Sequence, residues 1–194
     1  HKIIFLLNTY EEYQYFKSKG INCRFINHNA FVDPNIFKPI TCPKEYDIIY
    51  NGRLEIVKRH YLLKSCKNIS LLSASVLRSD QSKIRYLNLL KKIIPNADIL
   101  NFDTPKKLKQ LSSFEEIPII KPKKVSNAIN KAKIGAILSY KEGACYASME
   151  YLLSGIPIVS TANIGGRDVF FDKRFCKTSL SNSYSIKKTV SNLL

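Results

Sequence analysis

The sequence contains no tryptophan, a single methionine (Met149) and no long apolar run. A membrane-spanning helix needs about 20 consecutive apolar residues, and no run approaches that length. The opening HKIIFLLNTY has too short an apolar run for a signal peptide and no cleavage site of small residues. These absences predict a cytoplasmic protein. Because the chain begins with His1 rather than Met, we also expect an excised piece of a longer protein or a processed product.

Metal-binding and disulfide patterns are also missing. The five cysteines are widely separated, odd in number and free of any CxxC pair, and the three histidines show no metal-ligand spacing. Free thiols in a reducing compartment fit this pattern better than a disulfide framework or a zinc site. The sequence therefore predicts neither a metal site nor a resident cofactor.

Positive charge is abundant instead. Lys and Arg number 31 against 15 Asp and Glu, which gives a formal charge of +16. Nucleic acid, an anionic membrane surface and phosphorylated small molecules are the partners that such a charge favours. Many of the lysines fall in helix-like segments such as KIRYLNLLKK, where a solvated helix face explains them equally well.

Apolar runs alternate with amphipathic stretches, which is typical of βαβ units. The pattern predicts an α/β fold, a Rossmann-like parallel sheet with flanking helices. The expected strands are 3–8, 22–27, 47–52, 70–77, 134–139 and 156–161, with short strands in ADILNF and IPII. The expected helices are 9–20, 57–66, 79–93, 125–133, 145–154 and 183–194, with another around PKKLKQLSS. Three prolines without sustained periodicity indicate a linker at 30–46.

Unusual residues collect where three of these strands end. Ligands of open parallel sheets bind beyond the carboxyl ends of the strands. The loops that follow 47–52, 134–139 and 156–161 supply cations, carboxylates and glycines, a set that suits a phosphorylated, hydroxyl-rich ligand. These residues are Gly52, Arg53, Lys58, Glu142, Gly143, Glu150, Gly165 and Gly166.

Each residue type has a chemical reason to be there. A helix that begins near Cys145 directs unpaired backbone N–H groups at its N-terminus, where phosphate binds. Gly143 lets a ligand approach the backbone closely. Arg53 offers a planar fork to phosphate oxygens and Lys58 a mobile point charge. Glu150, one turn into the helix, is an acceptor for sugar or ribose hydroxyls.

Ordinary structural roles explain each residue singly. Glu150 alone would be a surface glutamate that complements the helix dipole. Arg53 and Lys58 alone would be cations near a helix start, and Gly165-Gly166 alone would be a turn. Their co-location on one predicted sheet edge favours a ligand site.

Three segments in order resemble one enzyme family. NGRLEIVK resembles the GR-x4-K element of the retaining GT-B glycosyltransferases of family 4. EGACYASME is similar to the E-x7-E motif of that family, and SGIPIVSTANIGG to the stretch that follows it. The order and spacing of the three segments are kept over residues 47–172.

The resemblance implies roles for the site residues. Arg53 and Lys58 would hold the diphosphate of a nucleotide-sugar donor, Glu142 would contact the transferred sugar, and Glu150 would bind the ribose hydroxyls. We expect Glu142, Arg53 and Lys58 to be catalytic. The remaining donor-binding residues would be Gly52, Gly143, Ala144, Cys145, Tyr146, Gly165 and Gly166.

The resemblance also implies a mechanism and a domain plan. Family members retain the anomeric configuration, and no Asp-x-Asp is present to clamp a metal-bound diphosphate, so we expect metal-independent transfer. Residues 1–29 would end an N-terminal acceptor domain, 30–46 would link the domains, and 47–194 would bind the nucleotide sugar. A glycan or lipid-linked acceptor would bind the missing N-terminal domain, so we expect this fragment to be inactive alone. A lipid-linked acceptor implies that the protein makes peripheral contact with the inner face of an anionic membrane.

The sequence departs from the family pattern at two places. Ala144 and Cys145 stand where the family has Phe-Gly, and Arg167, Asp168 and Val169 stand where it has a glutamate after the paired glycines. A noncatalytic nucleotide-sugar-binding module and a GT-B epimerase would share the same donor site. A basic nucleic-acid-binding domain would explain the charge, although no known motif of that class is present.

Overall fold

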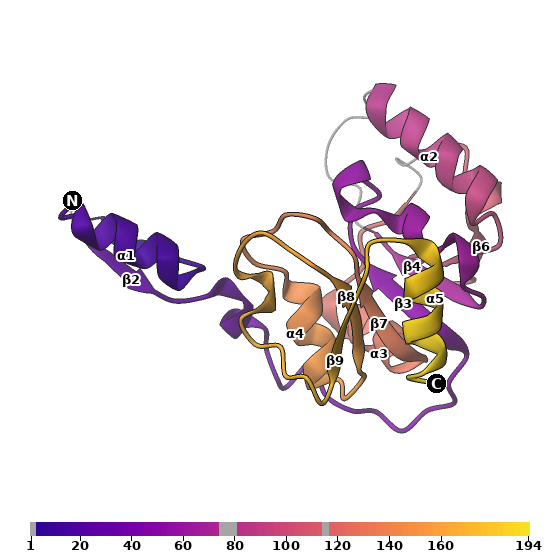
Figure 1. Ribbon diagram of the computed structural model, residues 1–194. Helices are drawn as coiled ribbons and strands as arrows, with labels where there is room; N and C mark the ends of the chain where they lie inside the picture. The colour runs from indigo at the N-terminus through magenta and orange to yellow at the C-terminus, as the bar shows by residue number, and fades with distance from the viewer. Residues whose placement is uncertain (1–2, 74–80, 114–116) are drawn as a thin grey trace.

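A seven-stranded sheet organises most of the chain in the computed structural model, which describes residues 3–73, 81–113 and 117–194 (Figure 1). The strand order is β6-β5-β4-β3-β7-β8-β9, and every neighbouring pair is parallel except β5 and β6. The strands are β3 (Tyr46–Asn51), β4 (Ile69–Leu72), β5 (Asp98–Ile99), β6 (Lys106–Lys107), β7 (Ala132–Ile137), β8 (Ile158–Thr161) and β9 (Cys176–Ser179).

Helices cover both faces of this sheet, because successive strand side chains point to opposite sides. In β3, Ile48 and Tyr50 join the apolar cluster on one face and Ile49 joins the cluster on the other. The first face carries α2 (Gln81–Ile93), α5 (Ser183–Ser191) and the 3-10 helix η3 (His60–Ser65). The second carries α3 (Pro122–Asn130) and α4 (Tyr146–Leu153). This arrangement confirms the predicted α/β fold.

The N-terminal residues form a small unit that stands apart from the large sheet (Figure 1). It comprises β1 (Phe5–Leu7), α1 (Tyr10–Ser18) and β2 (Cys23–Phe25), with the two strands parallel. Helix α1 begins after Thr9 because Thr9 and Glu12 form a reciprocal capping box. A 3-10 helix, η1 (His28–Phe31), follows β2 and contacts α4. The division at residues 29 and 46 stays a prediction.

The predicted helix 57–66 is wrong in kind. The segment forms two 3-10 helices, η2 (Ile56–Lys58) and η3, which are separated by Arg59 in the left-handed region at φ 55°. The side chain of Arg59 explains this conformation, because its Nε donates to the carbonyl of Leu138 at 2.6 Å and Nη2 to Thr161 Oγ1 at 2.7 Å. These two bonds tie the chain after β3 to the ends of β7 and β8.

Other predicted elements differ near the sheet edges. The helix predicted around PKKLKQLSS is the edge strand β6 followed by a single 3-10 turn, η4 (Leu108–Gln110). The strand predicted at IPII does not form in the described residues 117–120, where Pro118 lacks an N–H for pairing. Strand β9 lies in CKTS, which lacks the apolar pattern that identified the other strands. Residues 74–80 of the predicted strand 70–77 and helix 79–93 lie outside the described residues.

None of the helices in the described part of the chain is both long enough and apolar enough to cross a bilayer.

Candidate functional site

The strand order reverses beside β3, which places a topological switch point at the carboxyl edge of the sheet. Strand β4 lies on one side of β3 and β7 on the other, so the order β5-β4-β3-β7-β8-β9 has the switch point at which α/β sheets bind ligands. The loops after β7 and β8 meet in a bridge between Lys141 and Ile164. Tyr140 N donates to the carbonyl of Val57 at 3.4 Å, which brings in the loop after β3. The three loops expected from the sequence are therefore adjacent.

Lys58 and Glu142 contact each other directly at this switch point. Lys58 Nζ forms an ion pair with Glu142 Oε1, and the other carboxylate oxygen, Oε2, accepts the hydroxyl of Ser139. The two ionic side chains are only 13% and 12% exposed. Burial lowers the pKa of Lys58 from its usual range. Cys145 and, to a smaller extent, Glu55 act in the opposite direction and favour the charged ammonium.

Arg53 lies near Lys58 and is partly exposed to solvent. Its side chain is 52% exposed, and its Nη2 lies 3.5 Å from Glu55 Oε2. The positive charge of Arg53 adds to burial in lowering the pKa of Lys58, so the two cations share one electrostatic environment. Gly52 connects them to β3, and a Cβ at this position would lie 3.2 Å from the ring of Tyr50.

The N-terminus of α4 is only partly open. The backbone N–H of Cys145, which caps the helix, donates to Asn29 Oδ1 at 2.7 Å, so this amide already has an acceptor. Among the hydrogen bonds of the described residues, none gives the N–H of Tyr146 or Ala147 an acceptor, as expected at a helix start. Tyr146 is exposed, whereas Ala144 and Cys145 are half-buried. Burial raises the pKa of the Cys145 thiol.

Glu150 turns inward rather than toward solvent. Its Oε2 accepts a hydrogen bond of 2.7 Å from Asn51 Nδ2 at the end of β3. Burial raises the pKa of Glu150 to about 7, and the bond from Asn51 acts in the opposite direction. A surface glutamate that complements the helix dipole would not be buried in this way. The carboxyl group is instead placed beside Asn51 at the end of β3.

The paired glycines permit the loops to pack closely. Gly165 has φ 123°, and a Cβ there would overlap the carbonyl oxygen of Glu142. A Cβ at Gly166 would overlap the carbonyl oxygens of Asn8 and Gly143. These contacts place Gly165 and Gly166 against the Glu142 loop, and they explain both glycines by chain packing. Contact of either glycine with a ligand stays a prediction.

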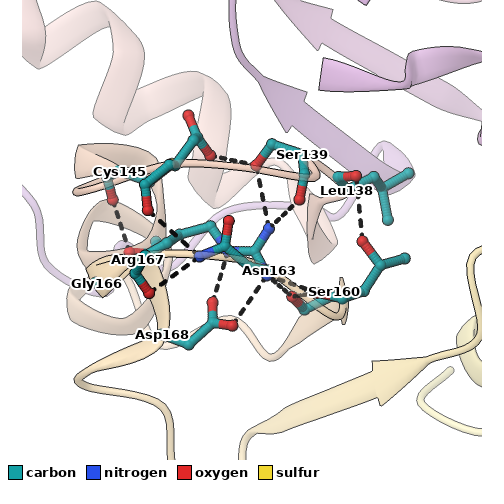
Figure 2. A network of polar contacts seen from close by, with 12 residues as sticks. Leu138, Ser139, Cys145, Ser160, Asn163, Gly166, Arg167 and Asp168 are labelled. Atoms are coloured by element: carbon teal, nitrogen blue, oxygen red, sulfur yellow. Dashed lines mark hydrogen bonds and ion pairs between the residues drawn. The ribbon is translucent and has the colours of Figure 1, made fainter. Parts of the chain in front are cut away.

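Arg167 is a central residue that the motif reading missed. Its side chain is fully buried, and Figure 2 shows its guanidinium between the ends of β7 and β8. It donates to the carbonyl and hydroxyl of Ser139, to Ser160 Oγ, to the carbonyl of Thr161 and to both carboxylate oxygens of Asp168. The available signal was the departure from the family pattern after the paired glycines.

Three asparagines of the N-terminal segment also reach this site without any sequence signal. Asn29, fully buried, accepts from Cys145 N and donates to Ser148 Oγ and to the carbonyl of Arg167, both at 3.2 Å. Asn27 Nδ2 donates to the carbonyls of Gly166 at 2.7 Å and Asn8 at 2.8 Å. The N-terminal unit is thereby attached to the loop after β7, which contains Glu142, and to the loop after β8.

A hollow of about 580 Å³ lies on the same carboxyl edge, beyond β4 and β5. It is lined by Asn101, Phe102, Pro118, Ile120 and Lys121, among others. Asn101 anchors its floor, because its Nδ2 donates to the carbonyl of Pro118 at 2.9 Å and to that of Ser73. No three His, Cys, Asp or Glu side chains gather as a metal site within the described ranges.

Several solved structures share this fold. Sucrose-phosphate synthase from Thermosynechococcus elongatus matches at TM-score 0.72 and 13% identity, over 98% of this chain and 48% of that one. Anabaena HepE in complex with UDP-glucose matches at TM-score 0.66 and 15% identity, over 96% and 52%. The C-terminal domain of the group 1 glycosyl transferase LpcC from Francisella tularensis matches at TM-score 0.52 and 14% identity, over 84% and 87%.

The chain has the GT-B glycosyltransferase fold. It spans about half the length of the sucrose-phosphate synthase and HepE chains, and most of the length of the LpcC C-terminal domain. No family model and no curated protein matches the sequence, so the likeness rests on structure.

Proposed function

We propose that this chain binds a nucleoside diphosphate sugar at the carboxyl edge of its sheet and forms the donor-binding half of a glycosyltransferase. The observation that carries the proposal is the position of the Lys58–Glu142 pair and of Glu150, bonded to Asn51 at the end of β3, at the switch point of the sheet. HepE, which has this fold, was solved with UDP and with UDP-glucose, and these ligands define the chemistry to test first.

The diphosphate would lie between Lys58, Arg53 and the start of α4. An incoming diphosphate gives the ammonium of Lys58 a new anionic partner in place of Glu142. Arg53, which is partly exposed, is free to reach phosphate oxygens from the solvent side. The N–H groups of Tyr146 and Ala147 add helix-terminus donors. Together these groups would stabilise the negative charge of the leaving diphosphate without a metal ion.

The nucleoside would extend from Glu150 across β3 toward β4 and β5. The carboxylate of Glu150 would accept hydrogen bonds from the ribose hydroxyls, with Asn51 holding its other side. The hollow beside Asn101 lies on the same edge, and its lining includes Phe102, Pro118 and Ile120, against which a base could pack. Burial has removed water from the Glu150 carboxylate, and the ribose hydroxyls would supply hydrogen bonds in place of that water.

The sugar would lie against Glu142. A carboxylate there can accept from sugar hydroxyls and stabilise positive charge that develops at the anomeric carbon. We further propose transfer with retention, in which the leaving diphosphate takes the proton of the acceptor hydroxyl on the same face of the sugar. That scheme asks the protein for leaving-group stabilisation and positioning rather than for a nucleophile.

The acceptor, a glycan or a lipid-linked saccharide, would bind a companion N-terminal domain. The β1–α1–β2 unit, attached through Asn27 and Asn29, would be the end of that domain, and the chain alone would be inactive. The excess of positive charge would favour peripheral contact with anionic lipid, at roughly 1 kcal/mol per Lys or Arg near the surface. Sedimentation with anionic vesicles at low salt measures that contact.

Calorimetric titration tests the donor site. Wild-type protein in EDTA should bind UDP, GDP or ADP, and the corresponding sugar nucleotide, and Lys58→Met should weaken both ligands at least about tenfold. Lys64→Met, an exposed lysine in the neighbouring η3, is the matched control and should bind as wild type does. Absence of binding by every nucleoside diphosphate, or equal losses in the two variants, would overturn the proposal. Transfer by the chain joined to its N-terminal domain separates an enzyme from a binding module or an epimerase.

A further inference from the structure

Arg167 cannot be a ligand-binding arginine, because its hydrogen-bonding capacity is used inside the protein. Its Nε and Nη2 donate to Asp168 at 2.6 and 3.1 Å. Nη1 donates to the carbonyl and hydroxyl oxygens of Ser139 at 2.6 and 3.1 Å. Nη2 also donates to Ser160 Oγ at 2.8 Å and the carbonyl of Thr161 at 2.6 Å. A guanidinium has five N–H groups, and all of them point at acceptors here.

The guanidinium fixes the direction of the Ser139 hydroxyl. Arginine only donates, so Ser139 Oγ must accept from it, and the single hydroxyl proton of Ser139 is left for another acceptor. That acceptor is Glu142 Oε2. A chain of contacts therefore runs from the buried cation through the Ser139 hydroxyl to the Glu142 carboxylate. Figure 2 shows the first two members of this chain, Arg167 and Ser139.

Glu142 is not needed to neutralise Arg167, so its carboxylate can interact with other groups. Asp168 takes two hydrogen bonds from Arg167 and neutralises it locally, so the buried cation does not need Glu142 as its counterion. Glu142 receives a directed hydrogen bond from Ser139 on Oε2, while Oε1 faces Lys58. The Glu142 carboxylate is thus oriented by the protein, with Oε2 held by the Ser139 hydroxyl and Oε1 directed toward Lys58.

We infer that Arg167 and Ser139 are positioning residues that aim the Glu142 carboxylate at the sugar of the donor. The inference rests on the proposed function, because it assigns their effect to the sugar end of that site. Any effect of Ser139 on sugar-nucleotide affinity must then depend on Glu142. A serine with a purely structural role would show no such dependence.

The chain offers a matched pair of serines for the test. Ser139 and Ser160 are both buried, and both hydroxyls accept from Arg167. Ser139 alone of the two contacts Glu142. Calorimetry with UDP and with UDP-glucose, or with whichever diphosphate pair the wild type binds, should give a selective loss. Ser139→Ala should weaken the sugar nucleotide about tenfold, as expected for loss of one hydrogen bond to a charged group, and UDP less than about threefold.

A double-variant cycle decides whether Ser139 acts through Glu142. In a Glu142→Gln background, Ser139→Ala should change sugar-nucleotide affinity by less than about twofold, because the group that it positions has lost its charge. Ser160→Ala should leave both ligands within about twofold of wild type in either background. Thermal unfolding of each variant confirms that it is folded before titration.

The possible failures are distinguishable. Wild-type protein that binds no nucleoside diphosphate overturns the proposed function. Wild-type protein that binds both ligands, with equal losses for Ser139→Ala and Ser160→Ala, overturns only the positioning role. A Ser139→Ala effect that persists unchanged in the Glu142→Gln background also overturns that role.

Discussion

Lys58 and Glu142 form a nearly buried ion pair although they are 84 residues apart in the sequence. Lys58 ends η2 after β3, and Glu142 lies in the loop after β7, so the pair spans the switch point of the sheet. In the ligand-free protein each charge compensates the other. A nucleotide sugar would provide a partner for both, the diphosphate for Lys58 and sugar hydroxyls for Glu142.

Breaking this pair should destabilise the ligand-free protein. Removing one partner leaves a buried charge uncompensated, so Lys58→Met and Glu142→Gln should each lower the free energy of unfolding by about 3 kcal/mol. The double variant should lose less than the sum of the two. Urea denaturation of all four proteins measures the coupling. Lys124→Met, which removes an exposed pair with Asp103, should cost less than about 1 kcal/mol. Additive losses for Lys58 and Glu142 would contradict a coupled pair.

The two glutamates should affect different ligands. Glu150→Gln weakens the acceptor for ribose, so UDP and UDP-glucose should both lose about one to two powers of ten in affinity. Glu142→Gln should weaken only the sugar nucleotide, because UDP lacks the sugar and gains a released Lys58. Titration of both variants with both ligands provides the comparison, and each variant serves as the control for the other. Equal losses for the two ligands in Glu142→Gln would refute its assignment to the sugar.

Glu150→Gln should also stabilise the ligand-free protein at alkaline pH. The pKa of Glu150 is raised by burial from 4.5 to about 7, so the folded protein holds a proton that the unfolded chain releases above 4.5. Wild-type stability should therefore fall as pH rises from about 4.5 to 7, and the glutamine variant should avoid that loss. We expect Glu150→Gln to be more stable by about 2–3 kcal/mol at pH 8, with little difference at pH 4.5. Urea midpoints at the two pH values measure it, and an equal difference at both would contradict the explanation.

His60 should give a pH dependence of opposite sign. It is fully buried against Tyr50, its Nε2 has no hydrogen-bond partner, and burial lowers its pKa from 6.5 to about 3. The unfolded chain takes up a proton below pH 6.5 that the folded protein refuses, so stability falls as pH falls from 6.5 toward 3. The slope is about 1.4 kcal/mol per pH unit.

The His60 contribution must be measured as a difference, because Glu150 opposes it between pH 4.5 and 6.5. His60→Phe keeps the ring stack on Tyr50 and removes the titration. The stability of His60→Phe relative to wild type should rise steadily as the pH falls below 6.5, whatever its value at neutral pH. A relative stability that does not change between pH 7 and 4.5 would show that folding does not lower the pKa of His60.

Much of the sheet, and the edge at which the candidate site lies, could be predicted from the sequence because both depend on local patterns. The apolar runs of β3, β7 and β8 are long enough to identify parallel strands, and the parallel arrangement then brings their loops to one edge. Lys58, Glu142 and Glu150 come together for that reason. The 3-10 helices around Arg59 did not follow, because their cause is two hydrogen bonds from Arg59 to residues at least 79 positions away.

The residues that support the site could not be predicted from the sequence either, because their roles also depend on contacts between distant parts of the chain. Arg167 resembles any surface arginine in the sequence, and only the tertiary structure shows that its charge is buried among Ser139, Ser160 and Asp168. Strand β9 has a polar sequence in which only the first and last residues, Cys176 and Ser179, are buried, and it is held by pairing with β8 rather than by its own pattern.

Asn29 should act as a clamp between the N-terminal unit and α4. Its amide accepts from Cys145 N and donates to the carbonyl of Arg167 and to Ser148 Oγ, all within a fully buried contact. Asn29→Ala would leave at least two buried polar groups without a partner, at about 1–3 kcal/mol each, so we expect a loss of about 2–4 kcal/mol in the free energy of unfolding.

Asn29→Asp separates the two halves of that clamp. The aspartate keeps an acceptor for Cys145 N but turns the donor toward Arg167 into a second oxygen, which would face a carbonyl oxygen across about the same gap. It should therefore destabilise the protein at least as much as Asn29→Ala, although it is nearly the same size. Asn35→Ala, in the same segment but exposed, should change stability by less than about 0.5 kcal/mol. Urea denaturation gives the energies, and hydrogen exchange should show faster exchange of the Cys145 amide in Asn29→Ala but less so in Asn29→Asp. An aspartate variant as stable as wild type would mean that the bond to Arg167 contributes nothing, and the clamp would reduce to the cap on α4.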